Sequence, residues 1–86
     1  MTRVEREVEV AGELGLHARP AAEFARSASR FASEVRVAKG GREADAKSVL
    51  LVLTLDVRRG DRVRLSASGP DAEAAVEELA RLVASQ

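Results

Sequence analysis

The chain has 86 residues, of which 45% are hydrophobic and 33% charged, and its 14 basic side chains balance 14 acidic ones. A chain of this length is expected to form one domain over residues 1–86 with a thin core, which excludes enzymes that need a deep catalytic cleft. The charge balance gives no reason to expect binding to nucleic acid or to a membrane surface, and the absence of cysteine excludes disulfides and thiolate chemistry.

The same sequence gives no reason to expect a metal, another cofactor or a membrane anchor. One histidine without any cysteine cannot assemble a structural zinc site. The longest apolar run, residues 49–53, is far shorter than the ~20 residues that span a bilayer. The polar start "MTRVEREVEV" lacks the apolar core of a secretory signal, so we expect a cytoplasmic protein.

The first two predicted elements are a strand and a helix. Val4, Val8 and Val10 alternate with charged residues, which predicts a strand with one buried face. From Ala18 to about Phe31 the apolar residues follow helical spacing, with charged residues on the opposite side. This pattern predicts an amphipathic helix that begins beside His17.

Turn residues divide the next segments. The stretch "EVRVAKGGREADA" predicts two short strands joined by Gly40 and Gly41, since glycine supplies the positive φ angles of hairpin turns. In "DRVRLSAS", the residues Val63, Leu65 and Ala67 alternate with polar ones and predict another strand.

The C-terminal segment is predicted to be a helix. Glu77 lies four residues before Arg81, a spacing that supports an ion pair on a helix surface. One apolar stripe runs along the segment and consists of Ala72, Ala75, Val76, Leu79, Leu82 and Val83.

The segment "AKSVLLVLTLDV" is ambiguous. An apolar run rich in Val and Leu fits a buried strand, whereas Asp45 and Ser48 are residue types that cap short helices. With either assignment, the chain is of the α+β class, with helices packed on one face of a small antiparallel sheet.

His17, the only histidine, is predicted to lie at the start of the first helix. The first N–H groups of a helix have no intrahelical partner and carry about half a positive charge, so a helix start attracts anions. Pro20 suits the first turn because its missing N–H costs nothing there. The helix end and Arg19 disfavour the imidazolium, which leaves a nucleophilic ring at neutral pH. A phosphoryl group on that ring would meet N–H groups and a guanidinium.

Each of these residues also has a simpler interpretation. A lone histidine near a helix start is most often a solvated or capping residue, and Arg19 alone is typical of an exposed charge. Pro20 alone is a helix starter, and Ser48 alone is a cap. Their combination favours a phosphohistidine site.

Two stretches resemble one known family. "GLHARPAAEFA" is similar to the active-site motif, and "AKSVLLVLTL" to the regulatory-serine segment, of HPr, the histidine-containing phosphocarriers of the bacterial phosphoenolpyruvate-dependent sugar phosphotransferase system. The resemblance extends from about residue 4 to residue 83. It implies an HPr-like open-faced sandwich: a four-stranded antiparallel sheet in the order 1-4-2-3, covered on one face by three helices. It also implies a short helix after Ser48.

The resemblance also implies the function. His17 corresponds to the histidine that is phosphorylated on Nδ1, and Arg19 and Pro20 match the motif around it. The phosphoryl donor would be enzyme I and the acceptor a sugar-specific enzyme IIA domain. The protein would therefore be a phosphoryl carrier and not an enzyme. Ser48 matches the serine that an ATP-dependent HPr kinase/phosphorylase modifies in some bacteria.

Partner docking in this family uses a shallow apolar patch on the short helix together with the first helix. Leu51 departs from the family, since many members have glycine or lysine there. This departure bears on partner selectivity and not on the phosphotransfer chemistry. The residues of this chain at the docking positions are Ala22, Arg26, Leu50, Leu51 and Leu53.

The apolar run itself agrees with a docking patch. Not all five residues of 49–53 can be buried on one helix. We expect Val49, Val52 and Leu55 in the core, which leaves Leu50 and Leu53 partly exposed near His17. An exposed apolar patch on a small monomer usually marks a partner site.

One other interpretation remains open, and a second is disfavoured. A regulatory adaptor of the same fold would act through Ser48 or through docking alone, with a transcriptional regulator as partner and no role in transport. An unrelated α+β structural or nucleic-acid-binding module lacks a mechanism, because the chain is neutral and has no exposed-aromatic motif.

Overall fold

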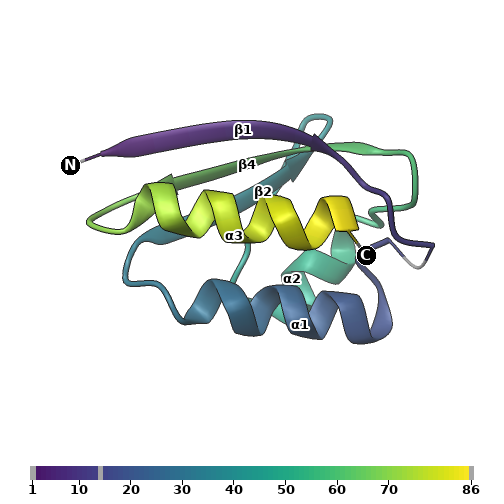
Figure 1. The fold of residues 1–86 in the computed structure, drawn as a ribbon. Coiled ribbons are helices and arrows are strands. Elements are labelled where there is room, and N and C mark those ends of the chain that lie inside the picture. The colour runs from purple at the N-terminus through teal and green to yellow at the C-terminus, as the bar shows by residue number, and fades with distance from the viewer. Residues whose placement is uncertain (1, 14, 86) are drawn as a thin grey trace.

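The computed structural model describes residues 2–13 and 15–85. In chain order the elements, traced in Figure 1, are β1 (Arg3–Glu9), α1 (Ala18–Ser29), β2 (Glu34–Lys39), β3 (Arg42–Asp45), α2 (Val49–Thr54), β4 (Arg62–Ser68) and α3 (Ala72–Ser85). Every predicted element is present, and α1 ends two residues before the predicted end. Within the described ranges, no helix has the length and apolar character needed to cross a membrane.

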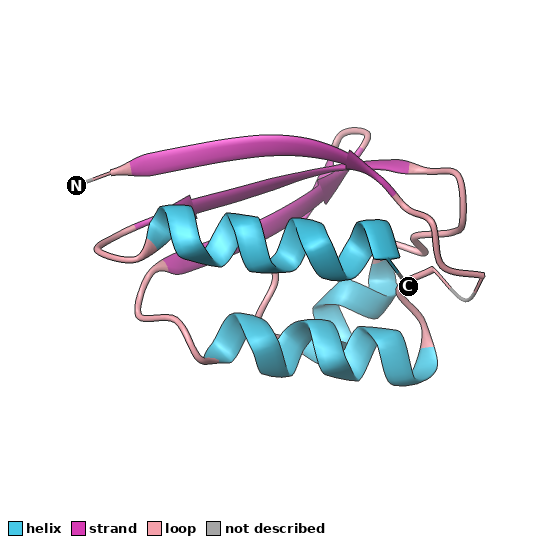
Figure 2. Ribbon diagram, viewed as in Figure 1, coloured by secondary structure: helices cyan, strands magenta, loops and turns pink. Residues whose placement is uncertain are grey.

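The four strands form one antiparallel sheet in the order β1-β4-β2-β3. β4 pairs with both β1 and β2, so the last strand of the chain lies inside the sheet. All three helices lie on the same side of the sheet (Figure 2). The predicted α+β class, the strand order and the one-sided helical layer are therefore confirmed.

The core lies between the sheet and the helices. Val63, Leu65 and Ala67 of β4 are buried at alternate positions, as the period of two predicts. They belong to one hydrophobic cluster with Phe24 of α1 and Leu79 of α3. Burying one such Leu or Phe side chain stabilises the fold by about 1.5–3 kcal/mol. Val, Leu and Ala make up most of this core, as the scarcity of aromatic residues in the sequence predicts.

The β2–β3 hairpin has the predicted turn. Lys39 pairs with Arg42 across it, and Gly40 has a φ of 60°. Glycine adopts this left-handed conformation without steric cost, which is why it stands at the turn.

The surface of α3 differs from the prediction in one ion pair. Arg81 Nη2 lies 2.6 Å from Glu78 Oε2, so the partner of Arg81 is Glu78 and not the predicted Glu77. Side chains three and four residues apart are both neighbours on a helix surface. Spacing alone therefore did not decide between them.

A carboxylate connects the end of α1 to the start of α3. Asp71 accepts hydrogen bonds from the backbone N–H groups of Ala32 and Ser33, each at 2.9 Å, and from the Ser33 hydroxyl at 2.5 Å. The Ser33 hydroxyl, followed by these N–H groups, lowers the pKa of Asp71 below its ordinary value. This contact fixes the two long helices at the end of the molecule away from His17.

Candidate functional site

His17 lies at the start of α1, as predicted. It is the N-cap residue, with extended backbone angles (φ −126°, ψ 160°), and its side chain makes no capping hydrogen bond to the helix. The side chain is 39% exposed. The imidazole therefore takes no part in capping and is accessible from solvent.

The chain turns sharply immediately after His17. Ala18 has a φ of 52°, in the left-handed region that residues with a side chain rarely adopt. Pro20, two residues later, lacks an N–H group, so it contributes no unpaired donor to the first turn. The first turn of α1 therefore offers the N–H groups of Ala18 and Arg19 beside the histidine.

The loop before His17 is pinned to the segment that follows α2. Leu16 donates a backbone hydrogen bond to the carbonyl oxygen of Val57 at 3.0 Å. Gly15, with a φ of 60°, approaches so closely that a Cβ there would lie 2.2 Å from the same oxygen. The glycine of "GLHARP" is thus required by this close approach.

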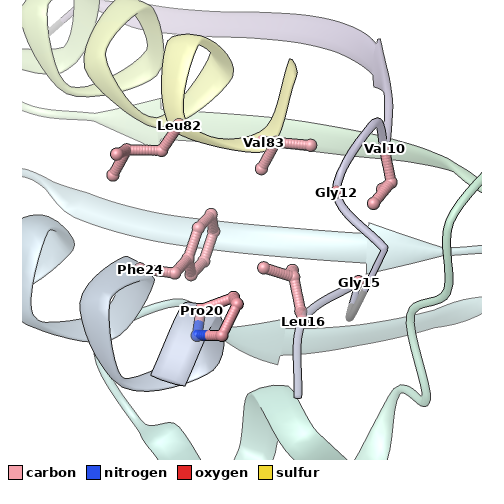
Figure 3. A pocket seen from close by; sticks show the side chains of 8 residues that line it. All are labelled: Val10, Gly12, Gly15, Leu16, Pro20, Phe24, Leu82 and Val83. Atoms are coloured by element: carbon pink, nitrogen blue, oxygen red, sulfur yellow. The ribbon is translucent and has the colours of Figure 1, made fainter. Parts of the chain in front are cut away.

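Pro20 packs the start of α1 against the core. Figure 3 shows its ring beside Leu16 and Phe24, with Leu82 and Val83 of α3 on the other side. The apolar hollow between these residues has a volume of about 10 Å³, near the lower limit for one water molecule. It is a packing defect under the helix start and too small for a ligand. The histidine accordingly stands on a surface and not in a cleft.

A carboxylate lies against the imidazole. His17 Nε2 is 3.1 Å from Asp56 Oδ1, and the Asp56 side chain is 50% exposed. Sequence reasoning did not identify Asp56; it named only the helix start and Arg19 as the charges near the ring. The one available signal was an aspartate directly after the apolar run of α2, where a residue that tolerates φ above zero commonly ends a helix. Asp56 has a φ of 51°.

Positively charged side chains hold Asp56 in place. Arg58 donates hydrogen bonds to Asp56 Oδ2 from Nε at 3.2 Å and from Nη2 at 2.9 Å. These bonds, followed by the charges of Arg58, Lys39 and His17, lower the pKa of the Asp56 carboxyl below its ordinary value against the opposing effect of burial. Lys39 Nζ donates to the Asp56 carbonyl oxygen at 2.6 Å and pairs with Asp61 Oδ2 at 2.8 Å. His17 therefore borders a network of alternating charges.

Arg19 is exposed on the first turn of α1. Among residues 2–13 and 15–85, its guanidinium has no ion-pair or hydrogen-bond partner, whereas Arg58 is occupied by Asp56. The five N–H donors of Arg19 are thus available to an incoming group.

Ser48 is the N-cap residue of α2, as predicted. Its hydroxyl oxygen accepts a hydrogen bond from the backbone N–H of Leu51 at 3.2 Å, and its backbone is extended. This bond satisfies a backbone N–H of the first turn that has no partner within the helix. It therefore favours the helix over the strand in this ambiguous segment.

The exposed apolar side chains of α2 form a patch, here called the α2 patch, that consists of Val49, Leu50 and Leu51, exposed by 37%, 76% and 47%. The expected exposure of Leu50 is confirmed, and the prediction that Val49 lies in the core was wrong. Val49 shares the face of the buried Val52 but stands at the end of the helix, at the edge of the core. Helical periodicity predicts which face of a helix turns toward the core and not how deeply each residue on that face is buried.

The remaining predicted docking residues lie nearby. Leu53 is half-buried against the core. On α1, Ala22 is half-buried and Arg26 exposed. Because α1 and α2 are in contact, as Figure 1 also shows, these residues and the α2 patch lie on adjacent elements.

Comparison with known proteins gives consistent results. The chain matches a family model described as "PTS HPr component phosphorylation site" over residues 4–85. It is 43% identical over 79 residues to the phosphocarrier protein HPr of Vibrio cholerae, covering 92% of this chain and 93% of that protein. It is 44% identical over 80 residues to the HPr-like protein Crh of Bacillus subtilis, covering 93% and 94% of the two chains.

A solved structure supports the same relationship. The crystal structure of a phosphocarrier protein HPr from Bacillus anthracis superposes with a TM-score of 0.94 at 36% identity, covering 96% of this chain and 99% of that one. The family match and these relatives span nearly the whole chain. The chain therefore belongs to the HPr family of the phosphotransferase system.

Proposed function

We propose that this protein is a cytoplasmic phosphocarrier: His17 accepts a phosphoryl group on Nδ1 from a phosphorylated histidine of enzyme I and passes it to a histidine of an enzyme IIA domain. The observation that carries this proposal is the accessible imidazole at the start of α1, which makes no capping hydrogen bond. A side chain needed only for the helix cap would be bonded to the first turn.

The surroundings of the ring suit a transferring phosphoryl group. Negative charge near the first turn of α1 is stabilised by the helix dipole and by unpaired N–H groups. The exposed Arg19 guanidinium offers charge-assisted hydrogen bonds to phosphoryl oxygens. Such preorganised donors stabilise the charge of a transition state and not only that of the bound state.

The α2 patch gives this carrier a surface for its partners. Apolar patches rimmed by polar residues usually mark protein–protein contacts. Leu50 is 76% exposed and follows Ser48 by two residues, and Arg26 of α1 adds a positive charge suited to an acidic partner surface. Since His17 lies on an open surface, we expect each partner enzyme to supply the remaining groups of the reaction and to exclude water on docking.

The test is incubation of the protein with enzyme I and phosphoenolpyruvate, followed by mass measurement before and after acid treatment. The expected result is one added phosphoryl group that acid removes, because phosphoramidates are acid-labile and phosphoserine is not. His17→Ala should acquire none, and Ser48→Ala, the matched control, should acquire it as the wild type does. An acid-labile adduct on His17→Ala, or none on the wild type, would refute the proposal.

A second candidate function is a regulatory adaptor of the same fold. Ser48 caps α2 next to the α2 patch, where a phosphate would alter docking directly, and one relative is named an HPr-like protein rather than a phosphocarrier. Such an adaptor would depend on an HPr kinase/phosphorylase and a transcriptional regulator. Full biological activity of His17→Ala would favour this function, and its loss would favour the carrier.

A further inference from the structure

The contact between His17 and Asp56 has a chemical consequence for the histidine. The Oδ2 oxygen of Asp56 accepts two hydrogen bonds from Arg58, at 3.2 and 2.9 Å. The other oxygen, Oδ1, faces His17 Nε2 at 3.1 Å. The two oxygens of one carboxylate therefore have different partners, and the orientation of the carboxylate relative to the ring is fixed from the side opposite the ring.

The backbone of Asp56 is fixed as well. Its N–H donates to the carbonyl oxygen of Leu53 at 3.2 Å, and its own carbonyl oxygen accepts from Lys39 Nζ at 2.6 Å. The adjacent Val57 accepts the hydrogen bond from Leu16, the residue before His17. Both sides of the contact are thus anchored to the same short stretch of the fold.

The identity of the groups decides where the proton lies. An ionised carboxylate has only acceptor atoms, so the imidazole nitrogen that faces it must carry hydrogen. In a neutral imidazole with hydrogen on Nε2, the free electron pair is on Nδ1. The Asp56 contact therefore selects the ring form in which Nδ1 is the nucleophile.

We propose that Asp56 is a positioning residue for phosphoryl transfer through His17, which it holds in the form with hydrogen on Nε2. This inference rests on the proposed function. In the transfer, the Nδ1 electron pair forms the new N–P bond, while the bond from phosphorus to the donor nitrogen breaks and its electrons remain on the donor. The Nε2 proton stays, so the ring becomes positively charged beside the Asp56 carboxylate. In the onward transfer Nδ1 recovers the electron pair of the N–P bond, and the ring leaves as neutral imidazole.

The simpler interpretation is a surface ion pair without consequence, since exposed pairs contribute little to stability. Stability measurements would not distinguish these two interpretations. The ring form and the transfer rate do distinguish them, because the loss of a merely structural contact would leave both unchanged.

Two variants test the proposal. Asp56→Gly removes the carboxylate, and glycine suits the φ of 51°. In Asp56→Asn the amide oxygen should face Arg58, which can only donate, and the amide NH₂ should face Nε2, which favours hydrogen on Nδ1. Glu13→Gln, which removes the same charge from the exposed loop before α1, is the matched control.

The measurements are the ¹⁵N chemical shifts of the His17 ring at a pH where the ring is neutral, and the rate of phosphoryl transfer from phosphorylated enzyme I. We expect hydrogen on Nε2 in the wild type and in Glu13→Gln, a mixture of the two forms in Asp56→Gly, and mainly hydrogen on Nδ1 in Asp56→Asn. Transfer should slow by about 10-fold or more in both Asp56 variants without a fall in melting temperature, as is typical of carboxylates that orient metal-binding histidines.

An unchanged ring form in both Asp56 variants, or transfer at the wild-type rate in both, overturns the proposal. Failure of the proposed function would differ: the wild type itself would then take no phosphoryl group from enzyme I, whatever its ring form.

Discussion

The backbone N–H of Leu16 donates a hydrogen bond to the carbonyl oxygen of Val57 at 3.0 Å. This bond joins the loop before His17 to the segment that carries Asp56, two parts of the chain that are far apart in sequence. The geometry between the imidazole and the carboxylate therefore depends on how closely these two backbones approach each other. Gly15 is the residue that permits the approach.

Gly15→Ala should destabilise the protein and disturb the His17 site. The new Cβ would lie 2.2 Å from the Val57 oxygen at a φ of 60°, so the loop must shift. Gly40→Ala is the matched control, because Gly40 has the same φ with no atom within 4 Å of the new Cβ. The control should lose only about 1–2 kcal/mol of unfolding free energy, the cost of placing a side chain in the left-handed region. Urea unfolding of the two variants measures the difference, and equal losses would mean that the close approach has no energetic role.

The order of helices and strands could be predicted because each has a distinct period and its turns are marked by glycine. The candidate site could be located because Gly15, His17, Arg19 and Pro20 stand in one continuous stretch, where local sequence carries the signal. Asp56 could not be found in this way. It reaches His17 only through a tertiary contact, and nothing in its local sequence refers to the histidine.

The depth to which each apolar residue is buried could not be predicted from the sequence either. Val49, Val52 and Leu55 have the same helical spacing, yet only Val52 and Leu55 are buried. Which of them reaches the core depends on where a short helix ends relative to the sheet. Similarly, Arg81 had two acidic neighbours at favourable spacing, and the side-chain geometry selected Glu78.

Arg19→Glu should slow phosphoryl transfer from enzyme I far more than it changes stability. The guanidinium is exposed and is available for phosphoryl oxygens and for an acidic partner surface. Surface substitutions of this kind change the free energy of unfolding by about 0.5 kcal/mol or less. Arg42→Glu, the same change at an exposed position of β3, controls for charge and should transfer normally. Comparable losses in stability and transfer for Arg19→Glu would show that Arg19 is structural.

Leu50→Ala should weaken partner docking without weakening the fold. Leu50 is 76% exposed, whereas Leu55, five positions later, is 3% exposed. Leu55→Ala should therefore cost roughly 2–5 kcal/mol of unfolding free energy, and Leu50→Ala close to none. Calorimetric titration with enzyme I, next to thermal unfolding, separates the two effects. Unchanged affinity in Leu50→Ala would remove the α2 patch from the docking surface.

Acid should destabilise the protein partly through Asp71. The pKa of this carboxyl is lowered in the folded state, first by the Ser33 hydroxyl and then by the N–H groups of Ala32 and Ser33, from an ordinary value of 3.8. A group with a lowered folded pKa contributes stability above its unfolded pKa, and this contribution is lost as the pH falls through the folded pKa. The melting temperature should therefore begin to fall as the pH approaches the ordinary value of 3.8, and it should continue to fall below that value.

In Asp71→Asn the melting temperature should be lower at neutral pH and should decline less steeply with acid, because the amide does not titrate. Glu73→Gln removes a nearby exposed carboxylate and should keep the wild-type slope. Identical slopes in Asp71→Asn and the wild type would contradict the role of Asp71.

Phosphorylation of Ser48 should act on docking and leave the fold unchanged. A phosphate carries about −1.5 to −2 charges at neutral pH. At the start of α2 this charge is favoured by the helix dipole by about 0.3–1 kcal/mol. Beside Leu50 and Leu51, however, the charge must lose its water when a partner covers the α2 patch, and it repels an acidic partner surface.

Ser48→Asp mimics the charge, and Ser48→Asn is its matched control, since both residues can accept the hydrogen bond from the Leu51 N–H that now goes to the Ser48 hydroxyl. Ser48→Ala loses this cap and should cost about 1 kcal/mol of unfolding free energy. We expect Ser48→Asp and Ser48→Asn to unfold at nearly the wild-type temperature, with slower transfer from enzyme I in Ser48→Asp only. A marked fall in the melting temperature of Ser48→Asp would show that the charge acts by destabilising the fold. Equal transfer rates in both variants would leave Ser48 as a helix cap alone.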